Sequence, residues 1–165
     1  MACILCIETA TPSCSVALAN NGILIYEKKS AEAQSHSALL AVFIQEALDV
    51  LKVHDLQLDA VAVSSGPGSY TGLRIGTSTA KGLCFGLDIP LIAIPTLEIL
   101  AQGAIRENHG EAAYYCPMID ARRMEVYAAV YDEQMNELAE TEAVIIDENS
   151  YSSFLEQRKV YFLGN

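Results

Sequence analysis

Residues 64–86 read SSGPGSYTGLRIGTSTAKGLCFG, and the fold class predicted from the sequence follows mainly from this segment. It follows the apolar run 60–63, which is typical of a buried strand. The Gly-Pro-Gly segment 66–68 then predicts a tight turn, because glycine reaches positive φ and proline fixes φ. Residues 70–86 have the composition of a helix. A strand, a tight turn and a helix in this order are typical of a layered α/β protein.

Small residues form a stripe on the predicted helix. Gly72, Gly76 and Ala80 recur every four residues, which leaves one side of the helix almost without side chains. Glycine inside a helix costs about 1 kcal/mol against alanine, so a close approach of another backbone should offset this cost. Two interpretations stay open, internal packing and a partner surface. Arg74 and Lys81 lie in the same segment and exclude a membrane-spanning helix.

Upstream of this stretch the sequence predicts three strands and a helix. The strands, at 3–9, 14–19 and 23–28, form an antiparallel meander with an Asn-Gly hairpin turn between the last two. The helix covers 37–52. Its expected core stripe is Leu40, Ile44, Ala47, Leu48 and Leu51, and Leu39, Val42 and Phe43 widen the apolar surface. So broad an apolar surface predicts a neighbour on each side of this helix.

Downstream the pattern continues and then restarts. A short strand at 90–94 precedes a helix that Thr96 caps and that ends near Arg106. Further strands are predicted at 113–119, 125–131, 143–146 and 160–163, with a short helix at 149–157. We therefore predict a first lobe at 1–106 and part of a second lobe at 107–165. The second lobe is expected to be incomplete, because an α/β unit normally continues from its strand into a helix.

Composition excludes several classes of protein. The 165 residues carry 21 acidic and 10 basic side chains, a net charge of −11, which disfavours tight direct binding of tRNA by this chain alone. No apolar run reaches the roughly 18 residues of a membrane span, and the N-terminus lacks the basic region of a signal peptide. Five cysteines lie in apolar runs, and Cys3 and Cys6 would point to opposite faces of a strand. Reduced thiols and a cytoplasmic location are expected.

Several segments together carry a resemblance to a known family. They are ILCIETATPSCSVAL (4–18), SSGPGSYTGLRIGTSTAKGL (64–83), IPLIAIPTLEILAQGA (89–104) and IDARRMEVYAAVY (119–131), with His36 opening the first long helix. In these segments the chain resembles the TsaB (YeaZ) family. The resemblance implies two ribonuclease-H-like lobes of the actin-like, Hsp70-like and sugar-kinase-like superfamily. Family members are longer and add C-terminal helices.

The resemblance implies a role in making N6-threonylcarbamoyladenosine at position 37 of tRNA. A TsaB protein is expected to do no chemistry itself and to activate its paralogue TsaD, the transferase. TsaE, an ATPase, joins the pair, and TsaC supplies the threonylcarbamoyl-adenylate. Pairing is expected through the helices 37–52 and 70–86, and a homodimer through the same helices when TsaD is absent.

The expected partner interface lies on these two helices, although periodicity leaves open which faces point outward. Its residues are His36, Leu39, Leu40, Phe43, Gly72, Arg74, Gly76, Thr77, Ala80 and Lys81. His36 has a second interpretation, a local hydrogen bond at the start of the helix.

No catalytic or metal-binding residues are expected. In TsaD the resemblance places two metal-binding histidines where this chain has Thr96 and Leu100, and neither residue suits iron or zinc. The three histidines lie far apart, and no Ser-His-Asp or Cys-His arrangement can be argued. The alternatives are a metal-dependent transferase or peptidase and a free-standing ATPase.

Two loops are weaker candidates. Gly66, Pro67 and Gly68 precede a helix and could hold an anion, although they match neither a P-loop nor a dinucleotide fingerprint. Superfamily ATPases carry an aspartate and a glycine where this chain has Glu8 and Ala10, so we expect no cofactor and an adenine nucleotide only in the complex. A second loop, with Asp120, Arg122 and Arg123, is either a solvated hairpin tip or a contact with TsaD, TsaE or tRNA.

Overall fold

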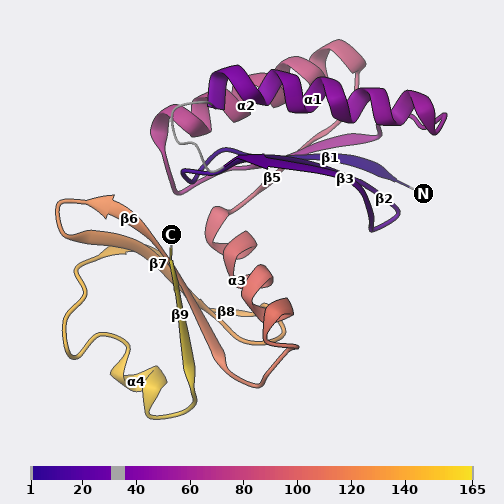
Figure 1. The fold of residues 1–165 in the computed structure, drawn as a ribbon. Coiled ribbons are helices and arrows are strands. Elements are labelled where there is room, and N and C mark those ends of the chain that lie inside the picture. The colour runs from indigo at the N-terminus through magenta and orange to yellow at the C-terminus, as the bar shows by residue number, and fades with distance from the viewer. Residues whose placement is uncertain (1, 31–35, 165) are drawn as a thin grey trace. The chain divides into compact units, whose positions relative to one another are not determined.

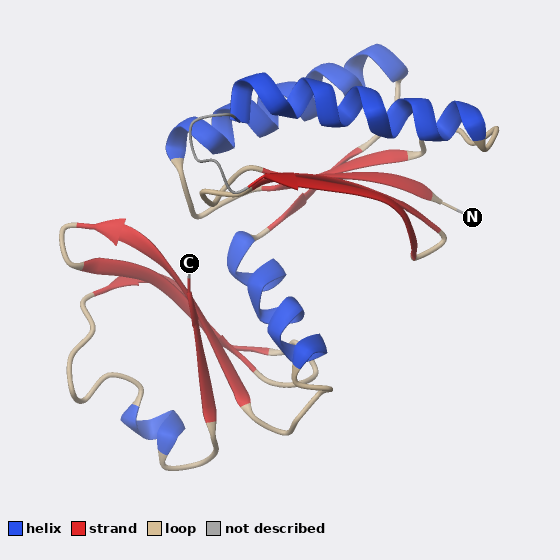
Figure 2. Ribbon diagram, viewed as in Figure 1, coloured by secondary structure: helices blue, strands red, loops and turns tan. Residues whose placement is uncertain are grey.

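The chain folds into two compact units, Met1–Ile94 and Pro95–Asn165. The computed structural model describes residues 2–30 and 36–164, and of His36 only the backbone. Figures 1 and 2 show that each unit consists of one sheet and its own helices. None of the described helices is long and apolar enough to cross a membrane.

Unit 1 is built on a five-stranded sheet. Its strands are β1 (Cys3–Glu8), β2 (Cys14–Asn20), β3 (Ile23–Ser30), β4 (Ala60–Ser64) and β5 (Leu91–Ile94), in the spatial order β3-β2-β1-β4-β5. The first three strands form the predicted antiparallel meander, and both residues of its last turn, Asn21 and Gly22, have positive φ. The later strands add in parallel beside β1.

Two helices cover one face of this sheet (Figure 1). α1 (His36–Val53) contacts mainly β2, and α2 (Tyr70–Leu87) contacts mainly β4. Side chains alternate along β1, so Cys3, Leu5 and Ile7 are buried beneath the helices while Cys6 points to the opposite face. The predicted separation of the Cys3 and Cys6 sulfurs is confirmed, and all five cysteines are free.

Unit 2 repeats the meander in a four-stranded sheet. Its elements are α3 (Thr96–Glu107), β6 (Tyr114–Arg122), β7 (Glu125–Tyr131), β8 (Glu137–Val144), α4 (Ser152–Leu155) and β9 (Val160–Gly164), and the sheet order is β8-β7-β6-β9. α3 packs Leu97 and Ala101 into a core with Tyr115 on one face of the sheet. A second core, around Cys116 and Val130, lies on the opposite face.

The boundary between the units falls earlier in the chain than predicted. Residues 95–106 were expected in the first lobe, but α3 packs on β6, β7 and β9 and therefore belongs to unit 2. Thr96 is not the predicted cap either, because the helix begins at Thr96 and its N-cap is Pro95. Contacts with a sheet decide which unit a helix joins, and helix periodicity does not report them.

Three elements of unit 2 differ by several residues from their predicted bounds. β6 covers 114–122 rather than 113–119. β8 covers 137–144 rather than 143–146, and α4 is limited to Ser152–Leu155 within the predicted 149–157. β8 has a mostly exposed, polar sequence, ELAETEAV, because it is an edge strand of the sheet. Such a strand lacks the apolar alternation from which strands are predicted.

Candidate docking face on two helices

The small-residue stripe of α2 faces the interior of unit 1. A Cβ added to Gly72 would lie 2.0 Å from the carbonyl oxygen of Thr9, and one added to Gly76 would lie 2.2 Å from Thr9 Oγ1. Thr9 Oγ1 donates a hydrogen bond of 2.8 Å to the carbonyl oxygen of Gly72. The close approach predicted from the sequence therefore occurs inside the chain. The partner-surface interpretation of Gly72, Gly76 and Ala80 is wrong, because all three are buried.

Two residues of α1 predicted at the interface are also buried. Leu40 is 1% exposed and Phe43 is 5% exposed, both in the core beneath the helices. Leu39 is partly buried and packs against the same core. Since the apolar arc of α1 is wider than one stripe, periodicity could not separate its inner from its outer positions. The side chain of His36 lies outside the described residues.

The predicted charged residues of α2 do point outward. Arg74 and Lys81 are exposed and Thr77 is half-buried. The Arg74 guanidinium lies 5.5 Å from the centre of the exposed Tyr70 ring. At helical spacing Arg74, Lys81 and Phe85 share one side of α2, opposite the buried glycines.

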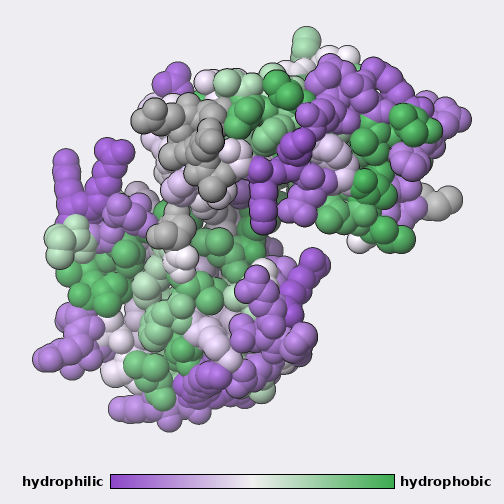
Figure 3. All heavy atoms as spheres, in the orientation of Figure 1, coloured by the Kyte–Doolittle hydropathy of each residue, from purple (hydrophilic) through white to green (hydrophobic). Residues whose placement is uncertain are grey.

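We define the docking face as the outward surface of α1 and α2. Its exposed residues include Ala38, Ala41 and Val42 on α1 and Tyr70, Arg74, Lys81, Gly82, Phe85 and Gly86 on α2. Phe85 is 92% exposed and Tyr70 is 75% exposed. Apolar patches interrupt the polar surface over this helical layer in Figure 3.

The docking face also contains a depression and open space. The depression, of about 410 Å³, is lined by Thr71, Arg74, Ile75, Ser78 and Thr79. A Cβ added to Gly82 or Gly86 would meet no heavy atom within 4 Å. These two glycines, unlike Gly72 and Gly76, are not required by any contact with the rest of the described chain. Their spacing in the sequence places them off the stripe of Gly72, Gly76 and Ala80, but periodicity alone does not say which side of α2 faces outward.

The Gly-Pro-Gly loop before α2 serves the packing of its own unit. A Cβ on Gly68 would lie 2.3 Å from the carbonyl oxygen of Ala10, and Ser69 N donates to that same oxygen over 2.7 Å. Ser69 then caps α2 by accepting a hydrogen bond from Gly72 N. These contacts explain Gly68 by a close approach to the β1–β2 loop, and they lend no support to a phosphate cradle at residues 66–68.

Glu8 lies at the end of β1, where its carboxylate contacts the β1–β2 loop and the last residue of β4. One of its carboxylate oxygens, Oε1, accepts hydrogen bonds from Ala10 N at 2.5 Å and from Ser64 Oγ at 3.0 Å. Burial raises the pKa of Glu8, and these hydrogen bonds oppose the rise. The carboxylate therefore joins β1, β4 and the β1–β2 loop.

Thr96 and Leu100, where the resemblance implies the metal ligands of TsaD, lie on α3. Thr96 is buried, with no hydrogen-bond partner for Oγ1 among the described atoms, and Leu100 packs against the core of unit 2. Within the described part of the chain, no three His, Cys, Asp or Glu residues are grouped so that they could hold a metal ion. The chemistry of these side chains does not fit iron or zinc.

Asp120 and Arg122 lie at the end of β6, and Arg123 lies in the turn that follows. All three are exposed, and Asp120 Oδ1 accepts a hydrogen bond of 2.8 Å from Arg122 N. Both arginines have positive φ. The predicted turn therefore begins later in the chain than expected, and a partner contact of these residues is still a prediction.

The doubled meander defines a class of protein. Both sheets place their third, second, first and fourth strands side by side in that order, and unit 1 adds a fifth. The solved structure of YeaZ from Pseudomonas aeruginosa is similar over 99% of this chain and 84% of that chain, with a TM-score of 0.80 and 28% identity. The chain thus has ribonuclease-H-like lobes of the actin-like, Hsp70-like and sugar-kinase-like class, which confirms the predicted fold class.

Sequence comparison identifies the family within this class. Residues 29–154 match the family model described as TsaD, tRNA N6-adenosine threonylcarbamoyltransferase. The protein of Escherichia coli (strain K12) called tRNA threonylcarbamoyladenosine biosynthesis protein TsaB is 39% identical over 86% of this chain and 62% of its own length. Its namesake in Bacillus subtilis (strain 168) is 34% identical over 98% of this chain and 70% of its own length. The chain belongs to the TsaB (YeaZ) family, and it spans about two thirds of the length of these relatives.

Proposed function

We propose that this chain is a non-catalytic accessory subunit in the synthesis of N6-threonylcarbamoyladenosine on tRNA. It activates TsaD by docking on it through the docking face of α1 and α2, and TsaE joins the pair. Alone, the chain forms a homodimer through the same face. We place it in the cytoplasm, which its free cysteines suit.

The family supports the pathway in this proposal. Relatives that cover most of this chain are named as threonylcarbamoyladenosine biosynthesis proteins, and the matched family model is that of the transferase. The resemblance implies that Thr96 and Leu100 stand where the transferase has its metal ligands. A protein that shares the fold of the transferase but lacks the metal-binding residues of the transferase is suited to binding rather than to catalysis.

The outward face of α2 is the observation that carries the docking step. Phe85 exposes 92% of its surface, which is unfavourable in water unless a partner covers it. Gly82 and Gly86 cost the helix about 1 kcal/mol each against alanine, and a Cβ added to either would meet no heavy atom within 4 Å beyond the neighbouring backbone of α2. A partner helix that packs closely on α2 would offset both costs.

The test is co-purification with TsaD from the same organism. Gly82→Leu adds a side chain where the chain leaves open space, so the fold should survive while a close-packed partner helix is displaced. We expect at least a tenfold loss of TsaD binding, a change of about 1.4 kcal/mol, by titration calorimetry. Modification of tRNA by the reconstituted system should fall in parallel.

Gly103→Leu is the matched control. Gly103 is an exposed glycine of α3 with no heavy atom within 4 Å of an added Cβ, so it receives the same change away from the docking face. Undiminished TsaD binding by Gly82→Leu, or an equal loss with Gly103→Leu, would contradict docking through α2. Stoichiometric iron or zinc in the purified protein, or ATP turnover without partners, would contradict the non-catalytic assignment. An adenine nucleotide is expected to bind only to the complex.

A further inference from the structure

α2 is a cationic helix in an acidic chain. The 165 residues carry 21 acidic and 10 basic side chains, yet α2 contains Arg74 and Lys81 and no acidic residue. The first acid that follows, Asp88, lies seven residues beyond Lys81, at the C-cap of the helix. The part of the docking face on α2 therefore has a charge opposite in sign to that of the chain as a whole.

Both cations of α2 are exposed, and neither forms an ion pair with a described residue. The Arg74 guanidinium contacts only the Tyr70 ring, at 5.5 Å from its centre. Because Arg74 and Lys81 are seven residues apart, they lie on the same side of α2, about 10 Å apart along its axis. A partner that covers them must remove water from two charges, which is unfavourable unless the partner supplies opposite charges.

The depression beside Arg74 has hydrogen-bond donors that suit a carboxylate. Arg74 lines it together with the hydroxyl residues Thr71, Ser78 and Thr79 and with Ile75, and none of these residues is acidic. All five belong to α2, so the depression opens onto the surface that a partner helix would cover. A guanidinium binds a carboxylate by charge and by directed hydrogen bonds, and hydroxyl groups add further donors.

A second copy of this chain offers no free carboxylate to these cations. The two acids of α1 are already paired, Glu46 with Lys28 at 3.2 Å and Asp49 with Lys52 at 2.8 Å. α2 itself contains no acid. Two docking faces in contact would therefore bring the cations of one copy against neutral or positive groups of the other.

We propose that the docking face selects a partner helix that carries carboxylates two turns apart, opposite Arg74 and Lys81. This inference rests on the proposed docking through α2 and adds the chemistry of the partner. One carboxylate would enter the depression beside Arg74 and the other would pair with Lys81, while the same helix covers Phe85, one turn further along. Complementary charges fix the register of an interface and the choice of partner. They make a second copy of the chain the weaker partner.

The test is a charge series on α2 with TsaD from the same organism. Arg74→Gln/Lys81→Gln removes both charges, and Arg74→Glu/Lys81→Glu reverses them. We expect calorimetry to show TsaD binding at least tenfold weaker for the first variant and at least a hundredfold weaker for the second. Wild-type binding should weaken as salt rises from about 0.05 M to about 0.5 M, and the neutral variant should lose most of this salt dependence.

Lys29→Gln/Arg106→Gln is the matched control. It removes two exposed cations from β3 and α3, away from the docking face, and should bind TsaD normally. Circular dichroism checks that every variant is folded. Self-association of Arg74→Gln/Lys81→Gln, measured by analytical ultracentrifugation, should be no weaker than that of the wild type.

The outcomes separate this inference from the proposed function. If Gly82→Leu abolishes TsaD binding but the neutral charge variant binds normally, docking through α2 holds and the acidic partner helix is overturned. An equal loss in the control, or self-association that weakens as much as TsaD binding, would also overturn it. If Gly82→Leu leaves TsaD binding intact, docking through α2 fails and this inference fails with it.

Discussion

Single glycines of α2 have opposite roles on its two sides. Gly76 is buried against Thr9, whereas Gly82 faces open space. From the sequence alone, both glycines are expected to destabilise the helix equally, because glycine loses more backbone entropy than other residues in any helix. Only the neighbours decide whether that cost is repaid inside the chain or by a partner.

Alanine substitutions at these two positions should therefore change stability in opposite directions. Gly76→Ala places Cβ 2.2 Å from Thr9 Oγ1, and we expect a loss of about 1–3 kcal/mol in the free energy of unfolding from the forced shift. Gly82→Ala should raise it by about 1 kcal/mol. Urea unfolding followed by circular dichroism measures both. A stable Gly76→Ala variant would refute the close contact between α2 and the β1–β2 loop.

The pH dependence of stability should distinguish Glu8 from Glu46. Burial raises the pKa of Glu8 above its ordinary value of 4.5, so its favourable contribution is complete below pH 4.5 and is lost as pH rises through the raised pKa. Glu8→Gln should therefore gain stability relative to the wild type as pH rises through that range. Unfolding in urea at a series of pH values measures this difference.

Glu46 gives the opposite sign and serves as the comparison. Hydrogen bonds from Tyr26 and Lys28 lower the pKa of Glu46, so its contribution is present above its ordinary value of 4.5 and is lost as pH falls through the lowered pKa. Glu46→Gln should consequently lose stability relative to the wild type as pH rises. If the stability of both variants, relative to the wild type, changed in the same direction with pH, the environments described for Glu8 and Glu46 would be refuted.

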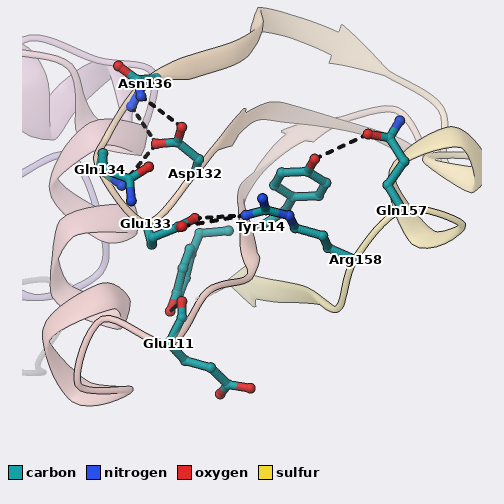
Figure 4. A network of polar contacts seen from close by, with 9 residues as sticks. Glu111, Tyr114, Asp132, Glu133, Gln134, Asn136, Gln157 and Arg158 are labelled. Atoms are coloured by element: carbon teal, nitrogen blue, oxygen red, sulfur yellow. Dashed lines mark hydrogen bonds and ion pairs between the residues drawn. The ribbon is translucent and has the colours of Figure 1, made fainter.

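At the scale of elements, hydrogen bonds in the turn between β7 and β8 stabilise the pairing of these two strands. Asp132 accepts hydrogen bonds from Gln134 N at 2.9 Å and from Asn136 N and Nδ2 at 2.8 Å, at the turn between β7 and β8 (Figure 4). Beside it, Glu133 pairs with Arg158 at 3.3 Å, just before β9. Most side chains of the edge strand β8 are exposed and add little packing to the sheet. The polar contacts of the turn before β8 therefore help to hold this strand in place.

Removing the Asp132 carboxylate should loosen this turn. We expect Asp132→Ala to cost about 1 kcal/mol of stability, since several hydrogen bonds to one exposed carboxylate are lost together. Hydrogen exchange should rise in residues 132–144 more than elsewhere. Glu148→Ala, an exposed acid with no described side-chain hydrogen bond, should change neither quantity. Unchanged exchange in β8 after Asp132→Ala would contradict this role of the turn.

At the scale of the whole molecule, each unit has its own core. The core of unit 1 extends from Cys3 to Cys84, and the described residues of unit 2 build separate cores on the two faces of its sheet. The docking face belongs wholly to unit 1.

Residues 1–94 should fold alone and keep TsaD binding. The fragment contains the whole five-stranded sheet and both of its helices, so its apolar core is complete. We expect a dispersed amide spectrum, cooperative unfolding and TsaD binding within tenfold of the full chain. A poorly dispersed amide spectrum would show that unit 1 needs unit 2 in order to fold. A folded fragment that does not bind TsaD would show that the partner contact lies outside unit 1.

The class of fold, the first meander and the positions of α1, α2 and α3 could all be predicted from the sequence, because strong apolar periodicity and a Gly-Pro-Gly turn are local signals. The sequence also carried the family resemblance. It failed where the signal was not local: at β8, whose polar edge lacks alternation, and at α3, whose unit depends on what it packs against. Only the tertiary structure decided that Gly72, Gly76, Ala80, Leu40 and Phe43 face inward and Gly82 and Phe85 outward. The direction in which a helix turns its face depends on contacts between residues far apart in the chain, such as Thr9 with Gly76, and no local pattern encodes such contacts.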